Sequence, residues 1–342
     1  MRILLIQTAF IGDVILATAL LEKLHYHFPK AQLDLLVRKG NETLFDGHPF
    51  LNEVLIWDKK TDGAALGKYQ NLWKLLKTIR RRCYSRVINL QRFGSTGFLT
   101  AFSGARATIG FDKNPFSKLF THRIPHRIQP GVHEVNRNAD LVQFFTDETV
   151  FRPKLYPPNR TLDYSRAVPY LCIAPTSVWS TKQFPESQWV AFVRALPPNL
   201  TVYLLGGPGD ADACERIRQA SSGELNLTIE NLAGKLGLLE SAALMRGAVL
   251  NYVNDSGPLH LCSAVNAPTC AVFCSTVPRF GFGPLADFSR IVEIGFLLYC
   301  RPCGLHGYKT CPEGHFRCAL DIRVKQLLEV LEEREQRGED RG

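Results

Sequence analysis

The feature that most constrains this chain is an alternation of short apolar stretches with longer amphipathic ones, which fills the first half of the sequence and restarts in the second. In the first half the pattern predicts strands over 2–6, 33–37, 54–57 and 86–90, with helices over 13–28 and 66–82. In the second half it predicts strands over 170–174, 201–205, 248–253 and 269–273, with helices over 185–195, 210–220, 238–246 and 257–265. Strands that alternate with helices form βαβ units around a parallel sheet. We therefore predict an α/β protein with two Rossmann-like halves.

A proline-rich stretch between residues 147 and 169 interrupts this alternation and shows little periodicity. Such a stretch is typical of a linker, and the length of 342 residues fits two domains of about 150 residues each. We expect an N-terminal domain over 1–155 and a C-terminal domain over 165–320. The last segment, 321–342, is predicted to be a helix over 324–334 followed by a charged, frayed tail.

The formal net charge of +9 favours an anionic partner. Charge alone does not choose among nucleic acid, phosphorylated glycans and an acidic membrane face. The sequence contains no nucleic-acid-binding signature, so we do not expect nucleic acid as a partner. No apolar run approaches the ~18 residues that a membrane span requires, and the first run is too short for a signal peptide. We therefore expect a soluble, cytoplasmic protein.

The loop of residues 8–13 joins the first predicted strand to the first helix. Parallel sheets bind ligands at the carboxyl ends of their strands, so this loop is expected to face a cleft. Asp13 stands at the start of the helix, where two roles are open: it caps the helix, or it acts as a general base. The loop lacks the G-x-G-x-x-G spacing, so a dinucleotide site is not predicted.

Two loops of the second half contain groups suited to an anionic ligand. The loop of residues 175–185 combines hydroxyl groups with one ammonium group, at Thr176, Ser177, Ser180, Thr181 and Lys182. This set fits a phosphate, although a solvated polar loop is the alternative. Gly206 and Gly207 follow the next strand and would let a ligand approach the backbone, but they also suit an ordinary turn. We interpret Asp210 and Asp212 as acidic residues of a first helical turn rather than as a metal-binding pair.

The most informative motif is Asn254-Asp255-Ser256-Gly257-Pro258-Leu259-His260, which follows the strand predicted over 248–253. Pro258 suits a helix start, and the backbone N–H groups of a helix start form a ready anion site. Asp255 and Ser256 would either hold a ligand hydroxyl or cap the helix. Three polar side chains at one strand end favour a ligand.

In this order, these motifs resemble glycosyltransferase family 9, the ADP-heptose:lipopolysaccharide heptosyltransferases. The resemblance covers roughly residues 1–330 and continues through Ala267-Pro268-Thr269, 273–278 and 282–284. It implies a GT-B fold, in which two Rossmann-like domains with parallel sheets face a central cleft. It also implies an inverting transfer of heptose from ADP-heptose to the anionic lipopolysaccharide inner core, with no cofactor or metal required for catalysis. Peripheral contact with the inner membrane face would accompany such an acceptor.

The resemblance implies a role for each matched residue. Asp13 would be the catalytic base, and Lys182 would assist catalysis at the diphosphate together with the hydroxyls of Thr176 and Ser177. Leu236 would lie against adenine. The sugar and phosphates would be held by Asp255, Ser256, Gly257 and His260. For the acceptor, the candidates among the basic residues of the N-terminal half are Arg92, Arg106 and Arg137, with a solvated basic face as the alternative.

Four cysteines cluster near the C-terminus, at Cys300, Cys303, Cys311 and Cys318. A C-x-x-C pair followed by two further cysteines has the ligand types of a structural zinc site. Reduced thiols are the second alternative, and disulfides, which an intracellular location disfavours, are the third.

Two other functions remain open for the whole chain. One is a transferase or epimerase of the same fold that uses another nucleotide sugar. The other is a non-catalytic module that binds glycans or nucleotides. The presence of both Asp13 and Lys182 argues against such a module, because a pure binder needs no base.

Overall fold

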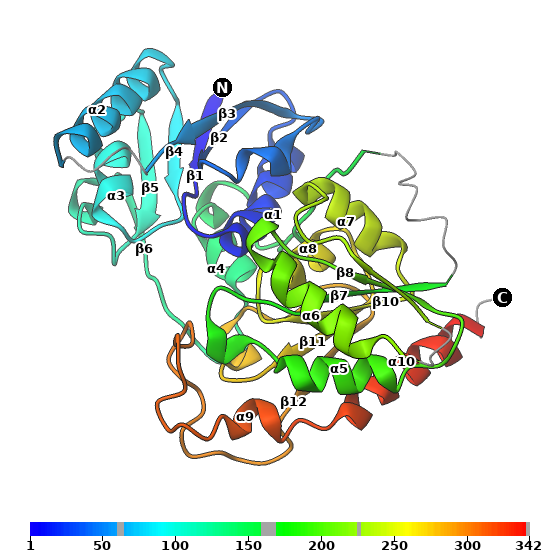
Figure 1. Ribbon diagram of the computed structural model, residues 1–342. Helices are drawn as coiled ribbons and strands as arrows, with labels where there is room; N and C mark the ends of the chain where they lie inside the picture. Colours follow the sequence, from blue (N-terminus) through cyan, green and yellow to red (C-terminus); the bar gives the residue numbers. More distant parts are fainter. Residues whose placement is uncertain (60–64, 159–168, 224–226, 340–342) are drawn as a thin grey trace. The chain divides into compact units, whose positions relative to one another are not determined.

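The computed structural model describes residues 1–59, 65–158, 169–223 and 227–339, and the chain forms two compact units, Met1–Tyr156 and Pro157–Gly342 (Figure 1). Each unit contains one parallel six-stranded sheet with helices packed on it. The boundary between the units falls inside the proline-rich stretch at 147–169, of which residues 159–168 lie outside the described part. Within the described residues, no helix combines the length and apolarity needed to cross a bilayer.

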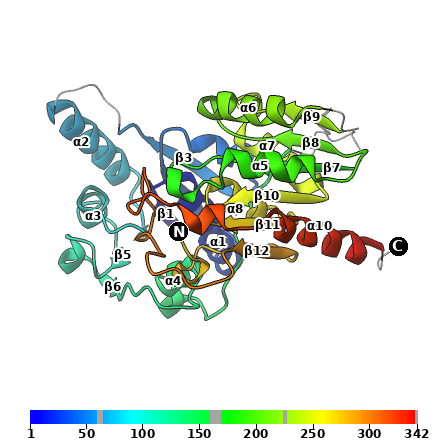
Figure 2. The same cartoon turned by 60° about the horizontal axis from the view of Figure 1, so that its bottom comes forward.

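The sheet of the first unit has the order β3-β2-β1-β4-β5-β6, with every pair parallel. Its strands are β1 (Arg2–Ile6), β2 (Gln32–Arg38), β3 (Leu51–Trp57), β4 (Arg86–Asn89), β5 (Ala107–Phe111) and β6 (His122–Ile124). Its helices are α1 (Ile11–His27), α2 (Ala65–Arg81), α3 (Gly94–Ala101) and α4 (Glu134–Asp140), with short 3-10 turns η1 (Glu42–Phe45), η2 (Ser117–Leu119) and η3 (Gln143–Phe145). α2 and α3 lie side by side in both views (Figures 1 and 2) and share one apolar cluster with the sheet, whereas α1 packs against α4.

The sheet of the second unit has the order β12-β11-β10-β7-β8-β9, again with every pair parallel. Its strands are β7 (Tyr170–Ala174), β8 (Thr201–Leu204), β9 (Thr228–Asn231), β10 (Leu250–Asn254), β11 (Thr269–Phe273) and β12 (Ser289–Glu293). Its helices are α5 (Glu186–Arg194), α6 (Ala211–Ser221), α7 (Leu238–Gly247), α8 (Gly257–Ala264), α9 (Arg317–Leu320) and α10 (Val324–Glu339), with 3-10 turns η5 (Ser180–Lys182), η6 (Pro208–Asp210) and η7 (Pro278–Phe280). The prediction of two Rossmann-like halves is confirmed.

The two sheets share one topology, because both follow the 3-2-1-4-5-6 order when the strands of each unit are counted separately. The order reverses between β1 and β4 in the first unit, and between β7 and β10 in the second. Ligands of open parallel sheets bind at the carboxyl ends of the strands that flank such a reversal. The fold therefore marks one edge of each sheet as the place for a site.

The last helix belongs to the core of the second unit. α10 runs to Glu339, five residues beyond the end predicted at Arg334. Its Leu327, Val330 and Leu331 are buried in the same apolar cluster as the sheet and α5. Residues 324–339 thus form one helix that packs on the second unit. The tail that was predicted to fray from residue 335 is helical as far as Glu339.

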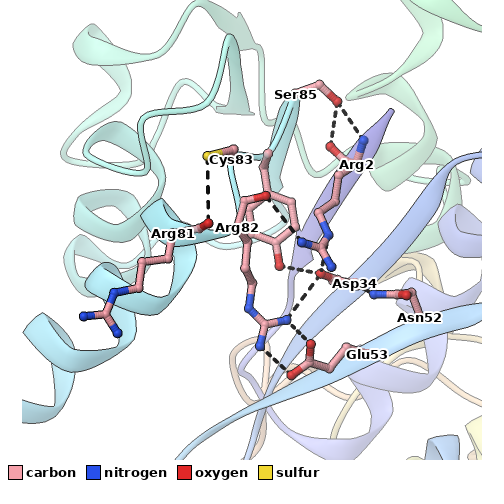
Figure 3. A network of polar contacts seen from close by, with 9 residues as sticks. Arg2, Asp34, Asn52, Glu53, Arg81, Arg82, Cys83 and Ser85 are labelled. Carbon is pink, nitrogen blue, oxygen red and sulfur yellow. Dashed lines mark hydrogen bonds and ion pairs between the residues drawn. The ribbon is translucent and has the colours of Figure 1, made fainter.

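At the edge of the first sheet where the strands begin, opposite their carboxyl ends, a buried carboxylate contacts side chains from several segments (Figure 3). Asp34 in β2 has no exposed surface and accepts hydrogen bonds from the Tyr84 hydroxyl at 2.6 Å and from the Asn52 amide at 2.7 Å. The guanidinium groups of Arg2 and Arg82 lie 3.4 and 3.6 Å from the same carboxylate. Burial and the bond to Asp34 raise the pKa of Tyr84, so its hydroxyl stays protonated and donates.

We expect Asp34→Ala to lower the free energy of unfolding of the first unit by about 3–5 kcal/mol, because the substitution leaves buried cations and donors without their carboxylate. Urea-induced unfolding of the full chain measures this loss. Glu53→Gln is the matched control, since Glu53 pairs with Arg82 at the exposed end of the same network. It should cost about 1 kcal/mol or less. Equal losses in the two variants would contradict a central role for Asp34.

Candidate active site

Three strand ends of the second sheet converge on one ion pair. The Lys182 ammonium, in the loop after β7, lies 2.7 Å from Oδ2 of Asp255, which follows β10. The Thr276 hydroxyl, which follows β11, donates to the same Oδ2 at 2.6 Å. Only 13% of the Lys182 side chain and 8% of the Asp255 side chain are exposed. The structure thus brings together two predicted donor residues, 73 positions apart in the sequence, at the point where the strand order reverses.

Asn254 opens the strongest motif and holds the lysine loop in place, a role that the sequence analysis did not assign to it. Its Oδ1 accepts from the backbone N–H of Phe184 at 2.9 Å, and its Nδ2 donates to the carbonyl of Pro175 at 2.8 Å. The side chain is fully buried and therefore clamps both ends of the 175–184 loop. The available signal was a polar residue at the last position of a buried strand.

The start of α8 stands directly after Asp255. Ser256 occupies the N-cap position, but its hydroxyl donates to the carbonyl of Asn254 at 3.4 Å and makes no capping bond. Gly257 is the first residue of α8, where the helix predicted over 257–265 also begins. His260 is 5% exposed, and its ring lies 6.4 Å from the ring of Phe282. The positive end of the α8 dipole therefore lies at the same strand edge as the Lys182–Asp255 pair.

The two glycines after β8 are explained by the turn that they enter. A Cβ on Gly206 would lie 2.6 Å from Cβ of Asp210, and the N–H of Gly207 donates to Oδ2 of Asp210 at 2.8 Å. The carboxylate of Asp210 thus accepts a hydrogen bond within the turn, which supports its interpretation as a structural residue rather than a metal ligand. The neighbouring loop after β9 packs on this turn, because a Cβ on Gly234 would lie 2.9 Å from Cα of Pro208. Half-buried Leu236 follows in that loop, which places it beside the glycine turn at the same strand edge.

Residues 300–308, which we call the 300–308 segment, pack on the lysine loop. Thr181 donates its N–H to the carbonyl of Tyr308 at 3.1 Å, and its hydroxyl accepts from the N–H of Tyr308 at 2.8 Å. Gly307 has φ +77°, and a Cβ there would lie 2.9 Å from Oγ1 of Thr181 and 3.0 Å from Cγ of Lys182. The 300–308 segment contains two of the clustered cysteines, and its contact with Lys182 was not predicted from the sequence.

The clustered cysteines are free thiols in this structure. Burial raises the pKa of Cys318 to about 12 and that of Cys303 above its usual value. Sγ of Cys300 lies 3.8 Å from Nε2 of His315. Over the described ranges, no three His, Cys, Asp or Glu side chains are grouped as a metal would require. The structure contains no disulfide between these cysteines, and the choice between reduced thiols and a structural metal site stays a prediction.

In the first unit, Asp13 lies after β1 at the edge where the strand order reverses. It is the third residue of α1, half-buried, and the N-cap position belongs to Phe10. The N-cap interpretation of Asp13 is therefore wrong. The ends of the two flanking strands are joined by the Thr8 hydroxyl, which donates to Oε1 of Gln91 at 2.6 Å. Gln91 is 4% exposed and was not identified from the sequence.

A pocket of about 580 Å³ lies in the first unit between the end of β6 and α4. It is lined by Ile124, Pro125, Arg127, Gln129, Val132, Arg137, Asp140, Gln143 and Phe144. The guanidinium of Arg137 is 3% exposed and is held by Glu134 at 2.6 Å and by the carbonyl of Val132 at 2.7 Å. Arg127 is exposed. The pocket therefore presents one exposed guanidinium group and one that is buried and paired.

The three predicted acceptor arginines do not lie together. Arg92 follows β4. Burial lowers the pKa of His126, and the charges of Arg92 and Arg137 lower it further, so both guanidinium groups lie near His126. Arg106 precedes β5 and is exposed at the edge where strands begin. The parallel sheet thus separates Arg106 from the other two.

We expect the stability of the first unit to depend on His126. Burial, reinforced by the charges of Arg92 and Arg137, lowers the pKa of His126 to about 4. The unfolded chain, with an ordinary histidine pKa near ~6.5, therefore binds a proton at higher pH than the folded chain does. Stability is complete above about pH 6.5 and falls as the pH drops towards 4. In His126→Gln, the melting temperature should fall less between pH 7.5 and pH 5, and an unchanged slope would contradict this assignment.

Comparisons with known proteins bear on the family and on the fold. The family model described as Glycosyltransferase family 9 (heptosyltransferase) matches residues 72–306. The chain is 28% identical over 358 residues to lipopolysaccharide heptosyltransferase 1 of Pseudomonas aeruginosa, covering 96% of this chain and 93% of that protein. It is 28% identical over 281 residues to lipopolysaccharide heptosyltransferase 3 of Escherichia coli, covering 78% and 82%. The solved structure of E. coli ADP-heptose LPS heptosyltransferase II matches with a TM-score of 0.79 at 20% identity, covering 99% of this chain and 100% of that one. This likeness confirms the fold.

Proposed function

The chain belongs to glycosyltransferase family 9, and we propose that it transfers a heptose from ADP-heptose to the inner core of lipopolysaccharide with inversion at the anomeric carbon. The names of its relatives, which are lipopolysaccharide heptosyltransferases, support this choice of reaction. The observation that carries it is the Lys182–Asp255 pair beside the start of α8, at the strand reversal of the second unit.

On the donor side, negative charge grows on the diphosphate as the bond to the sugar breaks. The Lys182 ammonium and the N-terminus of α8 at Gly257 stabilise that charge electrostatically, and the hydroxyls of Thr176 and Ser177 complete the phosphate contacts. Lys182 exchanges Asp255 for phosphate when the donor binds. Asp255 is then available to accept hydrogen bonds from sugar hydroxyls.

The remaining donor contacts follow from the neighbouring loops. Ser256 and His260 contact the sugar and phosphates, and Leu236 packs on adenine beside the Gly206-Gly207 turn. Asp210 accepts a hydrogen bond from the N–H of Gly207, so we do not assign it as a metal ligand. Lysine and backbone N–H groups supply the positive charge that the reaction needs.

On the acceptor side, Asp13 is the base. Its carboxylate takes the proton of the attacking hydroxyl while the acceptor oxygen bonds to the anomeric carbon from the face opposite the diphosphate. ADP then leaves, and the new bond has the inverted configuration. The pocket at Arg127 and Arg137, with Arg92 near it, suits an anionic group of the core acceptor. Because lipopolysaccharide precursors are lipid-linked, we propose peripheral contact with the inner membrane face.

Calorimetry of the full chain with ADP, UDP and GDP tests the donor assignment. We expect ADP to bind most tightly, and ADP-heptose to be consumed with release of ADP when a core acceptor is present. Tighter binding of UDP or GDP would favour a same-fold enzyme with another nucleotide sugar. Donor binding without turnover would favour a non-catalytic module.

A further inference from the structure

The positive charge of this protein is concentrated in one part of the first unit. Between Asp62 and Glu134 the sequence contains thirteen Lys and Arg residues and a single carboxylate, Asp112. The chain as a whole has a net charge of +9, so the rest of it has a slight excess of carboxylates. The basic stretch forms α2, α3, η2 and the strands β4 to β6. This part of the first unit therefore attracts anions.

Exposed aromatic side chains lie within this basic region. Trp73 in α2 is 53% exposed, and its ring lies 5.5 Å from the ring of Phe98 in α3. Phe98 is in turn 5.0 Å from Phe102, which is 41% exposed. Phe93, immediately before α3, is 62% exposed. Large apolar groups that are gathered in this way on a surface mark a place where something docks.

Lysines flank the aromatic groups on the solvent side of α2. Leu76 and Ile79 are buried against the sheet, whereas Lys74 and Lys77 are exposed on the same side as Trp73. α2 contains no Asp or Glu. We call Trp73, Lys74, Lys77, Phe93 and Phe102 the α2–α3 surface.

We propose that the α2–α3 surface docks on an anionic lipid bilayer, an inference that rests on the proposed action on a lipid-linked acceptor. Aromatic rings settle at the level of the headgroups, and lysines are attracted by acidic lipids. A second copy of this chain is a poor occupant, because it would bring two strongly basic faces together. Phe93 follows Arg92 at the carboxyl edge of the first sheet, the edge that carries Asp13. A docked protein would therefore hold its base close to the membrane surface.

Sedimentation of the full chain with vesicles tests the proposal. We expect binding to phosphatidylcholine vesicles that contain phosphatidylglycerol, little binding to phosphatidylcholine alone, and weaker binding at high salt. Lys74→Gln/Lys77→Gln should lower the partition coefficient about 30-fold, since each basic residue near an acidic surface contributes roughly a factor of five. The matched control is Lys30→Gln/Lys325→Gln, which removes the same charge from exposed sites outside the basic stretch and should bind like the wild type.

Three results would overturn the inference: equal binding to neutral vesicles, equal losses in the two double variants, or tighter binding to duplex DNA than to acidic vesicles at the same ionic strength. Lys74→Gln/Lys77→Gln should retain wild-type transfer to a delipidated, water-soluble acceptor. If the wild type transfers heptose but does not bind acidic vesicles, only the membrane-docking inference is contradicted. If the wild type shows no transfer, the proposed function is contradicted. On vesicle binding, the emission of Trp73 should shift to shorter wavelength, and Trp73→Phe should abolish that shift.

Discussion

Asp13→Asn should lower the rate of heptosyl transfer by about 10²- to 10⁴-fold, because the amide cannot take the proton of the attacking hydroxyl. The substitution keeps the size of the side chain and its place as the third residue of α1. ADP affinity should stay at the wild-type level, since the donor residues all belong to the second unit. Initial rates of ADP release and calorimetry with ADP measure the two quantities separately.

The control for this variant is Asp46→Asn, which removes an exposed carboxylate of the same unit. It should transfer at the wild-type rate. Full turnover by Asp13→Asn would show that Asp13 only favours the start of α1 through its charge. A parallel loss of ADP affinity would show that the substitution disturbs more than the base.

Lys182→Ala should weaken ADP binding by roughly 10- to 100-fold, the range expected when a charge-assisted hydrogen bond to phosphate is lost. Transfer should slow further, by about 10²- to 10³-fold, because the lysine acts most strongly on the charge that develops as the diphosphate departs. The same substitution leaves the carboxylate of Asp255 in a largely buried position without its cation. We therefore also expect a loss of about 3 kcal/mol in the free energy of unfolding.

The double variant Lys182→Ala/Asp255→Asn separates these two effects. Neutralising Asp255 removes the unpaired charge, so the double variant should recover most of the lost stability while ADP affinity stays low. Urea-induced unfolding and calorimetry with ADP report the two outcomes. Recovery of ADP binding together with stability would mean that Lys182 acts on the donor only by holding the fold.

The strands that the sequence predicts best are those in the middle of each sheet. β1, β7 and β11 were predicted with their observed bounds, because a short, mostly apolar run is typical of a strand buried on both faces. β5 was missed although its sequence, ATIGF, contains no charged residue. β6, β9 and β12 were also missed. Their sequences, HRI, TIEN and SRIVE, mix charged and apolar residues, and pairing with a neighbouring strand holds them at the sheet edges.

The candidate site shows a similar division. Motif residues in the loops that follow a strand, such as Lys182 and Asp255, could be located from the sequence, because the carboxyl ends of parallel strands share one edge. Arg106 precedes its strand and so falls on the other edge. The clamp by Asn254 and the contact of Gly307 with Lys182 depend on residues from about 70 to 125 positions apart meeting in space, which no local pattern records.

The fit around Gly307 extends the proposed phosphate pocket to residues that supply none of its polar groups. A Cβ at this position would lie 2.9 Å from Oγ1 of Thr181 and 3.0 Å from Cγ of Lys182, so a side chain there would force these groups to shift. Sequence changes after residue 300, among the cysteines, should therefore be examined as lesions of nucleotide binding even when every recognised motif is intact. Relatives that differ there are the first place to look for altered donor choice.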